Sequence, residues 1–188
     1  MKRTSTMRLD LLGESQVLID LRATGLLAAV GHDPTLVARP ERFTLDVPEG
    51  DGPVDVAVAV HFRVDAIDVP AELGDSDKRK MRDNMRSADV LDQAHFPSID
   101  FRGRFQGSLS SGRVSGEIVI RGSAHPVEFG VEVRSANGGR EDRVMATGTW
   151  EGRLTSLGLR PYRALLGALR LEDWVRLRVE ARFGETPG

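Results

Sequence analysis

The sequence has no cysteine among its 188 residues, and other features that mark common protein classes are also missing. Disulfide bridges and thiolate chemistry are therefore excluded. The 26 lysines and arginines nearly balance the 28 aspartates and glutamates, and the net charge of -2 argues against bulk nucleic-acid binding. No apolar run reaches the roughly 18 residues that a transmembrane helix needs. The length suits one domain that buries its own core.

The N-terminal segment lacks a continuous apolar stretch of signal-peptide length, because Asp10 and Gly13 interrupt its leucines. We therefore expect a cytoplasmic protein. The folded domain is predicted to span residues 14–183, with flexible termini at 1–13 and 184–188.

Alternation of apolar and polar residues dominates the rest of the chain. In VDVAVAVHFRV, every second residue from Val54 to Val64 is large and apolar, which is typical of a β-strand with one apolar face. The pattern recurs in SIDFRGRF, RVSGEIVI, PVEFGVEV, RVMATGTWEG and WVRLRVEARF, and more briefly in QVLIDLR and RFTLDV. Turns rich in Gly, Ser and Asn join several of them and leave no room for crossover helices. The sheet is therefore predicted to be an antiparallel meander.

About eight such strands form either a sandwich or a closed barrel. Glycines inside strands (Gly103, Gly116, Gly130, Gly148) mark bends that let a sheet coil, which favours the barrel. Many residues expected to point inward are small, such as Val58. The chain has only seven Phe, two Trp and one Tyr to fill the interior, so an eight-stranded barrel would keep space inside. Alternation alone does not separate a lined cavity from a packed core.

One segment that departs from alternation, SDKRKMRDNMRSADVLD at 76–92, predicts a helix. Ser76 is the expected N-cap, and Met81 and Met85 lie one turn apart on the apolar face. We expect this helix at the mouth of the barrel, where methionines suit a flexible gate.

A second departure, RPYRALLGALR at 160–170, predicts another short helix that begins at Pro161. Its apolar stripe would consist of Tyr162, Leu165, Leu166 and Leu169. Arginines flank this stripe, so it is a candidate for transient docking on an anionic membrane surface.

The four histidines show no metal-ligand spacing. His61 is expected on a polar strand face, His95 just past the helix and His125 in a turn. The motif GHDP, with His32 and Asp33, is either a turn between two strands or a polar anchor at a barrel mouth. There is no G-x-S-x-G elbow or phosphate-binding loop, so we predict no catalytic residue, metal ligand or cofactor. A small hydrolase or metal-dependent enzyme using His32 and Asp33 stays open as the alternative.

Three stretches resemble a known family. MRDNMRSADVLDQAHFPSIDFRG (81–103) resembles the signature of the YceI-like, or polyisoprenoid-binding lipocalin-like, family, in which a helix end leads through an F-P turn into a strand. VSGEIVIRGSAHPVEFGVEV (114–133) resembles its I-R-G motif, and GLLAAVGHDPTLVAR (25–39) its G-H-D segment. The likeness runs from about residue 14 to 183. It departs from the family before the last strand, where the usual R-x-D-F-G-like stretch is absent.

This resemblance implies an all-β fold: an eight-stranded antiparallel lipocalin-like barrel with one or two short helices at the barrel end. It implies a binding or carrier protein that holds an isoprenoid or other long-chain, fatty-acid-like ligand in an apolar cavity, without cofactor or nucleic acid. It is also compatible with a homodimer, for which the sequence reveals no interface. A structural β-domain with a filled core remains the other alternative. The ligand-binding residues that we expect are Val58, Val60, Phe62, Met81, Met85, Ile99, Phe101, Ile118, Ile120, Phe129, Val131, Trp150, Tyr162, Leu177 and Val179.

Overall fold

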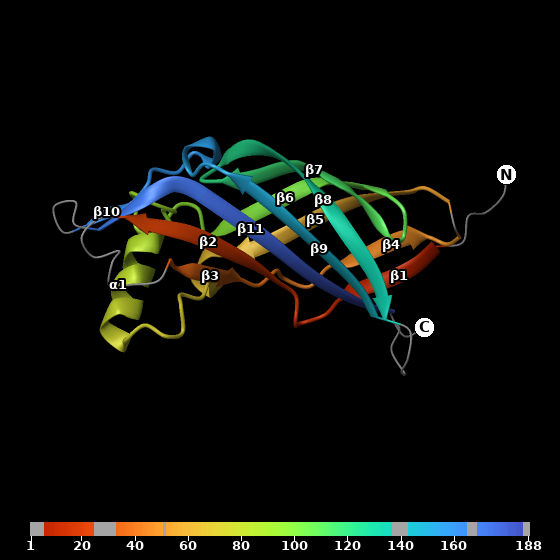
Figure 1. The fold of residues 1–188 in the computed structure, drawn as a ribbon, viewed down its shortest axis with the longest axis horizontal. Helices are drawn as coiled ribbons and strands as arrows, with labels where there is room; N and C mark the ends of the chain where they lie inside the picture. The colour runs from red at the N-terminus through yellow and green to blue at the C-terminus, as the bar shows by residue number, and fades with distance from the viewer. Residues whose placement is uncertain (1–5, 25–32, 51, 137–142, 165–168, 186–188) are drawn as a thin grey trace.

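The computed structural model describes residues 6–24, 33–50, 52–136, 143–164 and 169–185. One antiparallel sheet dominates it, with the strand order β3-β2-β11-β9-β8-β7-β6-β5 (Figure 1). The strands are β1 (Thr6–Leu11), β2 (Gln16–Thr24), β3 (Thr35–Ala38), β4 (Thr44–Pro48), β5 (Val54–Arg63), β6 (Ser98–Gly107), β7 (Ser111–Ile120), β8 (Ser123–Ala136), β9 (Arg143–Gly152), β10 (Arg163–Ala164) and β11 (Leu169–Glu185). The helical elements are η1 (Val64–Ala66), α1 (Asp75–Arg86) and η2 (Thr155–Leu157).

The sheet curls until its two edges meet. β1 and β2 lie one after the other along β11, and β4 and β3 follow them on the far side. Val37 of β3 exchanges two backbone hydrogen bonds with Asp68, at 2.9 and 2.8 Å, and the Glu41 amide donates to the His61 carbonyl of β5 at 2.8 Å. These hydrogen bonds bring the two edges of the curled eight-strand sheet together, and the fold is the predicted all-β, antiparallel, lipocalin-like one.

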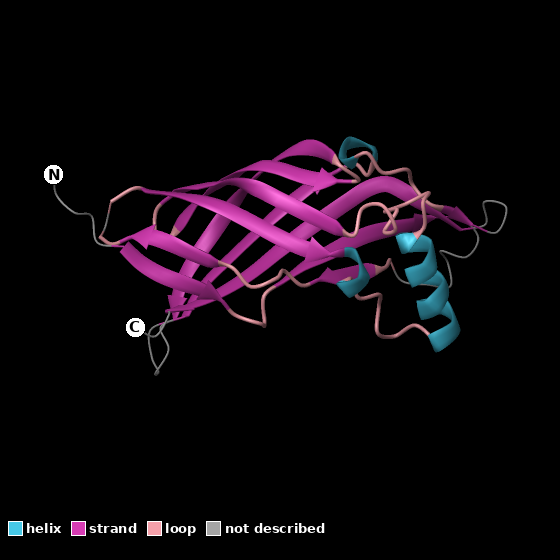
Figure 2. Cartoon of the chain, turned by 180° about the vertical axis from the view of Figure 1, so that it is seen from behind, coloured by secondary structure: helices cyan, strands magenta, loops and turns pink. Residues whose placement is uncertain are grey.

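The two ends of the barrel differ in what covers them. Helix α1, η2 and β10 lie at one end, called the helix end below, and the start of β1 and the end of β11 lie at the other, called the terminal end (Figure 1). Seen from behind, the strands run obliquely between the two ends (Figure 2). Within the described residues, no helix is long and apolar enough to cross a membrane.

The N-terminal strand β1 lies outside the domain that the sequence predicts to begin at residue 14. It pairs with both β11 and β4, and its Leu9 and Leu11 are buried. The sequence does not reveal this strand, because Arg8 and Asp10 give the segment the composition of a polar tail. In the structure both side chains point outward, and Arg8 forms an ion pair with Asp46 at 3.0 Å. β3 escapes prediction because four residues are too few to show alternation.

Helix α1 is present as predicted, with differences at its two ends. The N-cap is Gly74 rather than Ser76, with no side-chain cap, and the helix ends at Arg86, after which the chain continues in turns to the F-P segment. Met85 is 7% exposed and faces the barrel, which is the apolar face that the methionine spacing predicts.

The second predicted helix, at 160–170, is wrong. Arg163 and Ala164 form β10 and pair with Arg170 and Leu169 at the start of β11. The Leu171 amide also donates to the Tyr162 carbonyl at 2.9 Å. Because β11 extends past the end of β9 here, its free edge offers backbone hydrogen bonds, and these outweigh the local preference for a helix. Leu165 and Leu166, on which the membrane-docking idea depends, lie outside the described residues.

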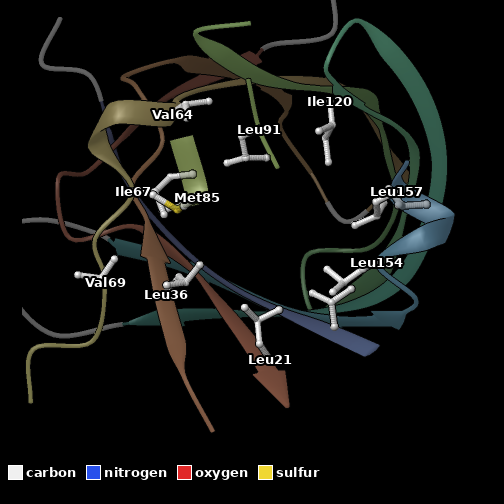
Figure 3. Close-up of a cluster of buried hydrophobic side chains, with 13 residues drawn as sticks. Leu21, Leu36, Val64, Ile67, Val69, Met85, Leu91, Ile120, Leu154 and Leu157 are labelled. Carbon is white, nitrogen blue, oxygen red and sulfur yellow. The ribbon is translucent and has the colours of Figure 1, made fainter. Parts of the chain in front are cut away.

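Buried apolar side chains form two separate clusters. The helix-end cluster draws on most of the elements at that end, and its side chains ring the barrel axis in Figure 3. It comprises Leu21, Leu36, Ala38, Val64, Ile67, Val69, Met85, Leu91, Ile120, Val127, Leu154, Leu157 and Val175. The terminal-end cluster is smaller and comprises Leu9, Leu11, Val47, Val54, Val56 and Phe183. In the second cluster the ring of Phe183 meets Phe43 edge to face, with centroids 5.9 Å apart.

Candidate functional site: an apolar cavity along the barrel

A cavity of ≈ 380 Å³ runs between the two clusters and is lined almost wholly by apolar side chains. Several lining residues belong to neither packed cluster, and among them are Val58 and Val60 of β5, Phe129 of β8 and Val179 of β11. We call these four the middle belt. They are half-buried although they face the interior, because the surface that they leave uncovered is turned toward the cavity.

Glycines keep the middle of the barrel open. Gly103 of β6 faces Gly116 of β7, and Gly148 of β9 faces Val131 of β8. A Cβ on Gly148 would lie 2.8 Å from the ring of Phe129, and one on Gly103 would lie 2.6 Å from the ring of Phe101. The rings of Phe101 and Phe129 therefore occupy space beside the glycine backbone that a larger residue at Gly103 or Gly148 would take.

The structure places the predicted site residues as follows. All of them except Met81 line the cavity: Val58, Val60, Phe62, Met85, Ile99, Phe101, Ile118, Ile120, Phe129, Val131, Trp150, Tyr162, Leu177 and Val179. Met81 packs against the helix-end cluster from one turn further out on α1. Their role in holding a ligand stays a prediction.

Sequence reasoning missed the wall at the terminal end. Leu9 and Leu11 of β1, Phe43 and Val47 around β4, and Phe183 all line the cavity. Phe183 was visible in the alternation of the last strand, but β1, whose Leu11 pairs with it, was not identified from the sequence. Leu154 and Leu157, around η2, carry no periodic signal because a single helical turn shows none.

Ion pairs lie on the outer face of the barrel, and the pair between Arg178 and Asp20 is bidentate. Arg178 of β11 donates from Nε and Nη2 to the two oxygens of Asp20 on β2, at 2.7 and 2.9 Å. Thr35 of β3 donates to the same carboxylate at 2.8 Å. Hydrogen bonding to Arg178 lowers the pKa of Asp20 below its usual value. Asp20 thus joins three neighbouring strands.

The three histidines that the structure describes lie on separate segments of the chain. His61 lies on the outer face of β5, as predicted, with Nδ1 2.7 Å from Asp100, and His95 follows α1 with Nδ1 2.9 Å from Asp92. The predicted turn position of His125 is wrong, because the hairpin turn occupies residues 121–122 and His125 pairs with Ile118 inside β8.

Of the alternative site at His32 and Asp33, the structure describes Asp33 alone. His32 lies outside the described residues, and Asp33 accepts a hydrogen bond from the Ala23 amide at 3.0 Å, which makes it a brace for the end of β2. In the part of the chain that the structure describes, no three His, Asp or Glu side chains converge as metal ligands would.

Both the sequence and the fold resemble known proteins. The model of the YceI-like domain matches residues 20–183. The chain belongs to the YceI-like family. Among solved structures, the barrel is similar to Burkholderia cenocepacia BcnA, with 16% identity and a TM-score of 0.57 over 90% of this chain and 96% of that one. It is also similar to the Campylobacter jejuni YceI protein, with 11% identity and a TM-score of 0.54 over 76% and 81%. These two likenesses show the fold alone, and no curated protein matches the chain.

Two of the motifs behind the YceI-like resemblance meet at the helix end. Arg121 and Gly122 form the two-residue turn between β7 and β8, with φ of 51° and 73°, as hairpins of this length require. Phe96 of the F-P segment packs on this turn, and a Cβ at Gly122 would come within 3.1 Å of its ring. The Val64 amide donates to the Pro97 carbonyl at 2.9 Å and ties the same segment to the end of β5.

Proposed function

We propose that this YceI-like protein binds a long-chain apolar ligand, an isoprenoid or a molecule of similar shape, and acts as its carrier. The observation that carries the proposal is the middle belt, whose apolar side chains face inward yet stay half-buried around a cavity of ≈ 380 Å³. Protein interiors are close-packed and hold few voids larger than a water molecule. A cavity of this volume falls in the range of small-molecule pockets.

The chemistry of the wall determines what such a site would hold. Burial of a hydrocarbon chain contributes about 0.8 kcal/mol per CH₂ group, so a long tail needs few polar contacts to bind. Selectivity would then come from the length and width of the channel between the two clusters. The family resemblance, which implies an isoprenoid, supports the same class of ligand.

The enzymatic alternative has less support among the described residues. Asp33 is engaged with the backbone of β2, and its predicted partner His32 lies outside the described part of the chain. The cavity has an apolar wall, whereas acid–base or nucleophilic chemistry needs convergent polar groups at the reacting atoms. Binding without chemistry is therefore the function that we propose.

The proposal is tested by equilibrium titration of the protein with farnesol and geranylgeraniol. We expect the longer alcohol to bind more tightly, because it buries more CH₂ groups. Val60→Trp would fill the middle of the channel and weaken both affinities at least tenfold. Ala59→Trp, on the outer face of the same strand, adds the same ring outside and should change neither. If neither alcohol binds, or if Val60→Trp binds as the unchanged protein does, the proposed function is wrong.

A further inference from the structure

A second pocket, of ≈ 660 Å³, adjoins the cavity at the helix end and differs from it in chemistry. Val90, Ile120, Arg160 and Tyr162 line both of them, so the apolar channel and the second pocket share one wall. Polar side chains make up much of the remaining lining: Asp89, Arg121, Ser123 and His125. We call this pocket the polar mouth.

Two guanidinium groups give the polar mouth a positive charge. Arg121 is half-buried and donates one hydrogen bond to the Val90 carbonyl at 3.4 Å, and Arg160 is exposed. Among the described residues, no carboxylate forms an ion pair with either of them, although most arginines of the barrel wall are paired. Asp89 is the carboxylate in the lining, so two arginines face one acid there.

His125 adds a ring nitrogen that the fold leaves without a partner. Its Nε2 atom is buried and makes no hydrogen bond to the described protein. The ring packs against Gly158, which follows η2 with φ of 71°, and a Cβ there would lie 3.1 Å from Nε2. Buried polar atoms are nearly always satisfied, so an unpaired nitrogen in a pocket wall points to a partner from outside the chain.

From these observations we infer that the polar mouth binds the oxyanion headgroup of an amphiphile whose tail lies in the apolar cavity. Phosphate, diphosphate and carboxylate groups share the required chemistry, because guanidinium groups form charge-assisted, bidentate hydrogen bonds with each of them. This inference rests on the proposed function, and it adds the class of headgroup and the direction of binding. The head lies at the helix end and the tail points toward Phe183.

The test compares three probes by isothermal titration: farnesyl diphosphate, farnesol and inorganic pyrophosphate. We expect farnesyl diphosphate to bind at least tenfold more tightly than farnesol, and pyrophosphate alone to bind weakly. In the double variant Arg121→Gln, Arg160→Gln the ratio of the farnesyl diphosphate affinity to the farnesol affinity should fall to about twofold or less. Arg160→Gln alone, at an exposed position, should remove part of the preference even if the double variant is poorly folded.

Arg102→Gln is the matched control, because Arg102 is an exposed arginine on β6 that lines neither pocket. It should leave both affinities unchanged. Equal affinities for farnesyl diphosphate and farnesol, or a preference that survives the double variant, would overturn the headgroup site and leave the proposed carrier function standing. Arginine-dependent binding of pyrophosphate without any binding of farnesol would indicate a free-anion site and overturn both proposals.

Discussion

The packed ends of the barrel and its hollow middle are built from the same strands but differ in what their inward side chains touch. At the terminal end, Phe183 of β11 is 5% exposed and lies against Phe43. Four residues earlier on the same face of the strand, Val179 is half-buried and lines the cavity. Alternation places both side chains inside, and only their neighbours on other strands decide whether each one packs or faces open space.

Because of this difference, we expect the ends of the barrel to determine the stability of the fold and the middle to determine ligand affinity. The clusters bury side chains fully and so supply most of the hydrophobic free energy of folding. The side chains of the middle belt are only partly buried when the chain folds. A ligand that covers their remaining apolar surface would contribute further hydrophobic free energy to binding. Substitutions at the ends should therefore change mainly the free energy of unfolding, and substitutions in the middle should change mainly ligand affinity.

The largest effect on stability is expected at the terminal end. Phe183→Ala should lower the free energy of unfolding by about 3–5 kcal/mol, because it opens a void in a packed cluster. Val179→Ala should cost about 1 kcal/mol or less, because it removes a smaller, half-buried side chain that belongs to neither packed cluster. Urea denaturation of both variants measures the contrast. Similar costs at the two positions would mean that the middle is packed like the ends.

The glycine pair between β6 and β7 should tolerate no side chain. A Cβ at Gly116 would lie 2.3 Å from the Arg102 carbonyl oxygen, so Gly116→Ala should destabilise the barrel by about 3 kcal/mol through forced separation of the strands. Gly130→Ala is the matched control, because nothing lies within 4 Å of a Cβ there. Thermal melting compares the two, and equal melting temperatures would refute the close approach of the strands.

Ligand should stabilise the native protein only where the middle is open. At a free concentration of one hundred times Kd, geranylgeraniol should add about 2.7 kcal/mol to the free energy of unfolding. Val60→Trp should show no such gain, while Ala59→Trp should keep it. Melting curves with and without the alcohol give the comparison, and a gain that persists in Val60→Trp would place the ligand elsewhere.

The smallest effect concerns the outer face, where Asp20 joins β2, β3 and β11. Asp20→Asn should cost about 1 kcal/mol at neutral pH, since it weakens charge-assisted hydrogen bonds at a partly exposed position. The pKa of Asp20 is lowered by Arg178, so its contribution is present above the unfolded value of 3.8 and is lost as the pH falls through the folded value. The difference between the two proteins should thus shrink below about pH 4 in urea titrations. A difference that is independent of pH would show that the ion pair is not its cause.

Much of this architecture could be predicted from the sequence, because alternation is a local signal that long strands display clearly. β5 through β9 and the last strand, the methionine face of α1 and most residues on the cavity wall follow from it. The signal fails where an element is short or is determined by its partners. β1 and β3 are held by pairing with β11 and β2, and β10 forms because the long edge of β11 lies next to it. Residues that line the polar mouth, such as His125 and Arg160, come from separate segments whose proximity only the closed barrel creates.

Native mass spectrometry of the protein as purified, followed by organic extraction and mass analysis of whatever it releases, tests the central claim most directly. The account predicts a stoichiometric long-chain species in the unchanged protein and its absence from Val60→Trp. A bare protein mass that stays unchanged after incubation with isoprenoid alcohols and fatty acids would contradict it. The barrel would then be a structural domain whose middle closes in solution.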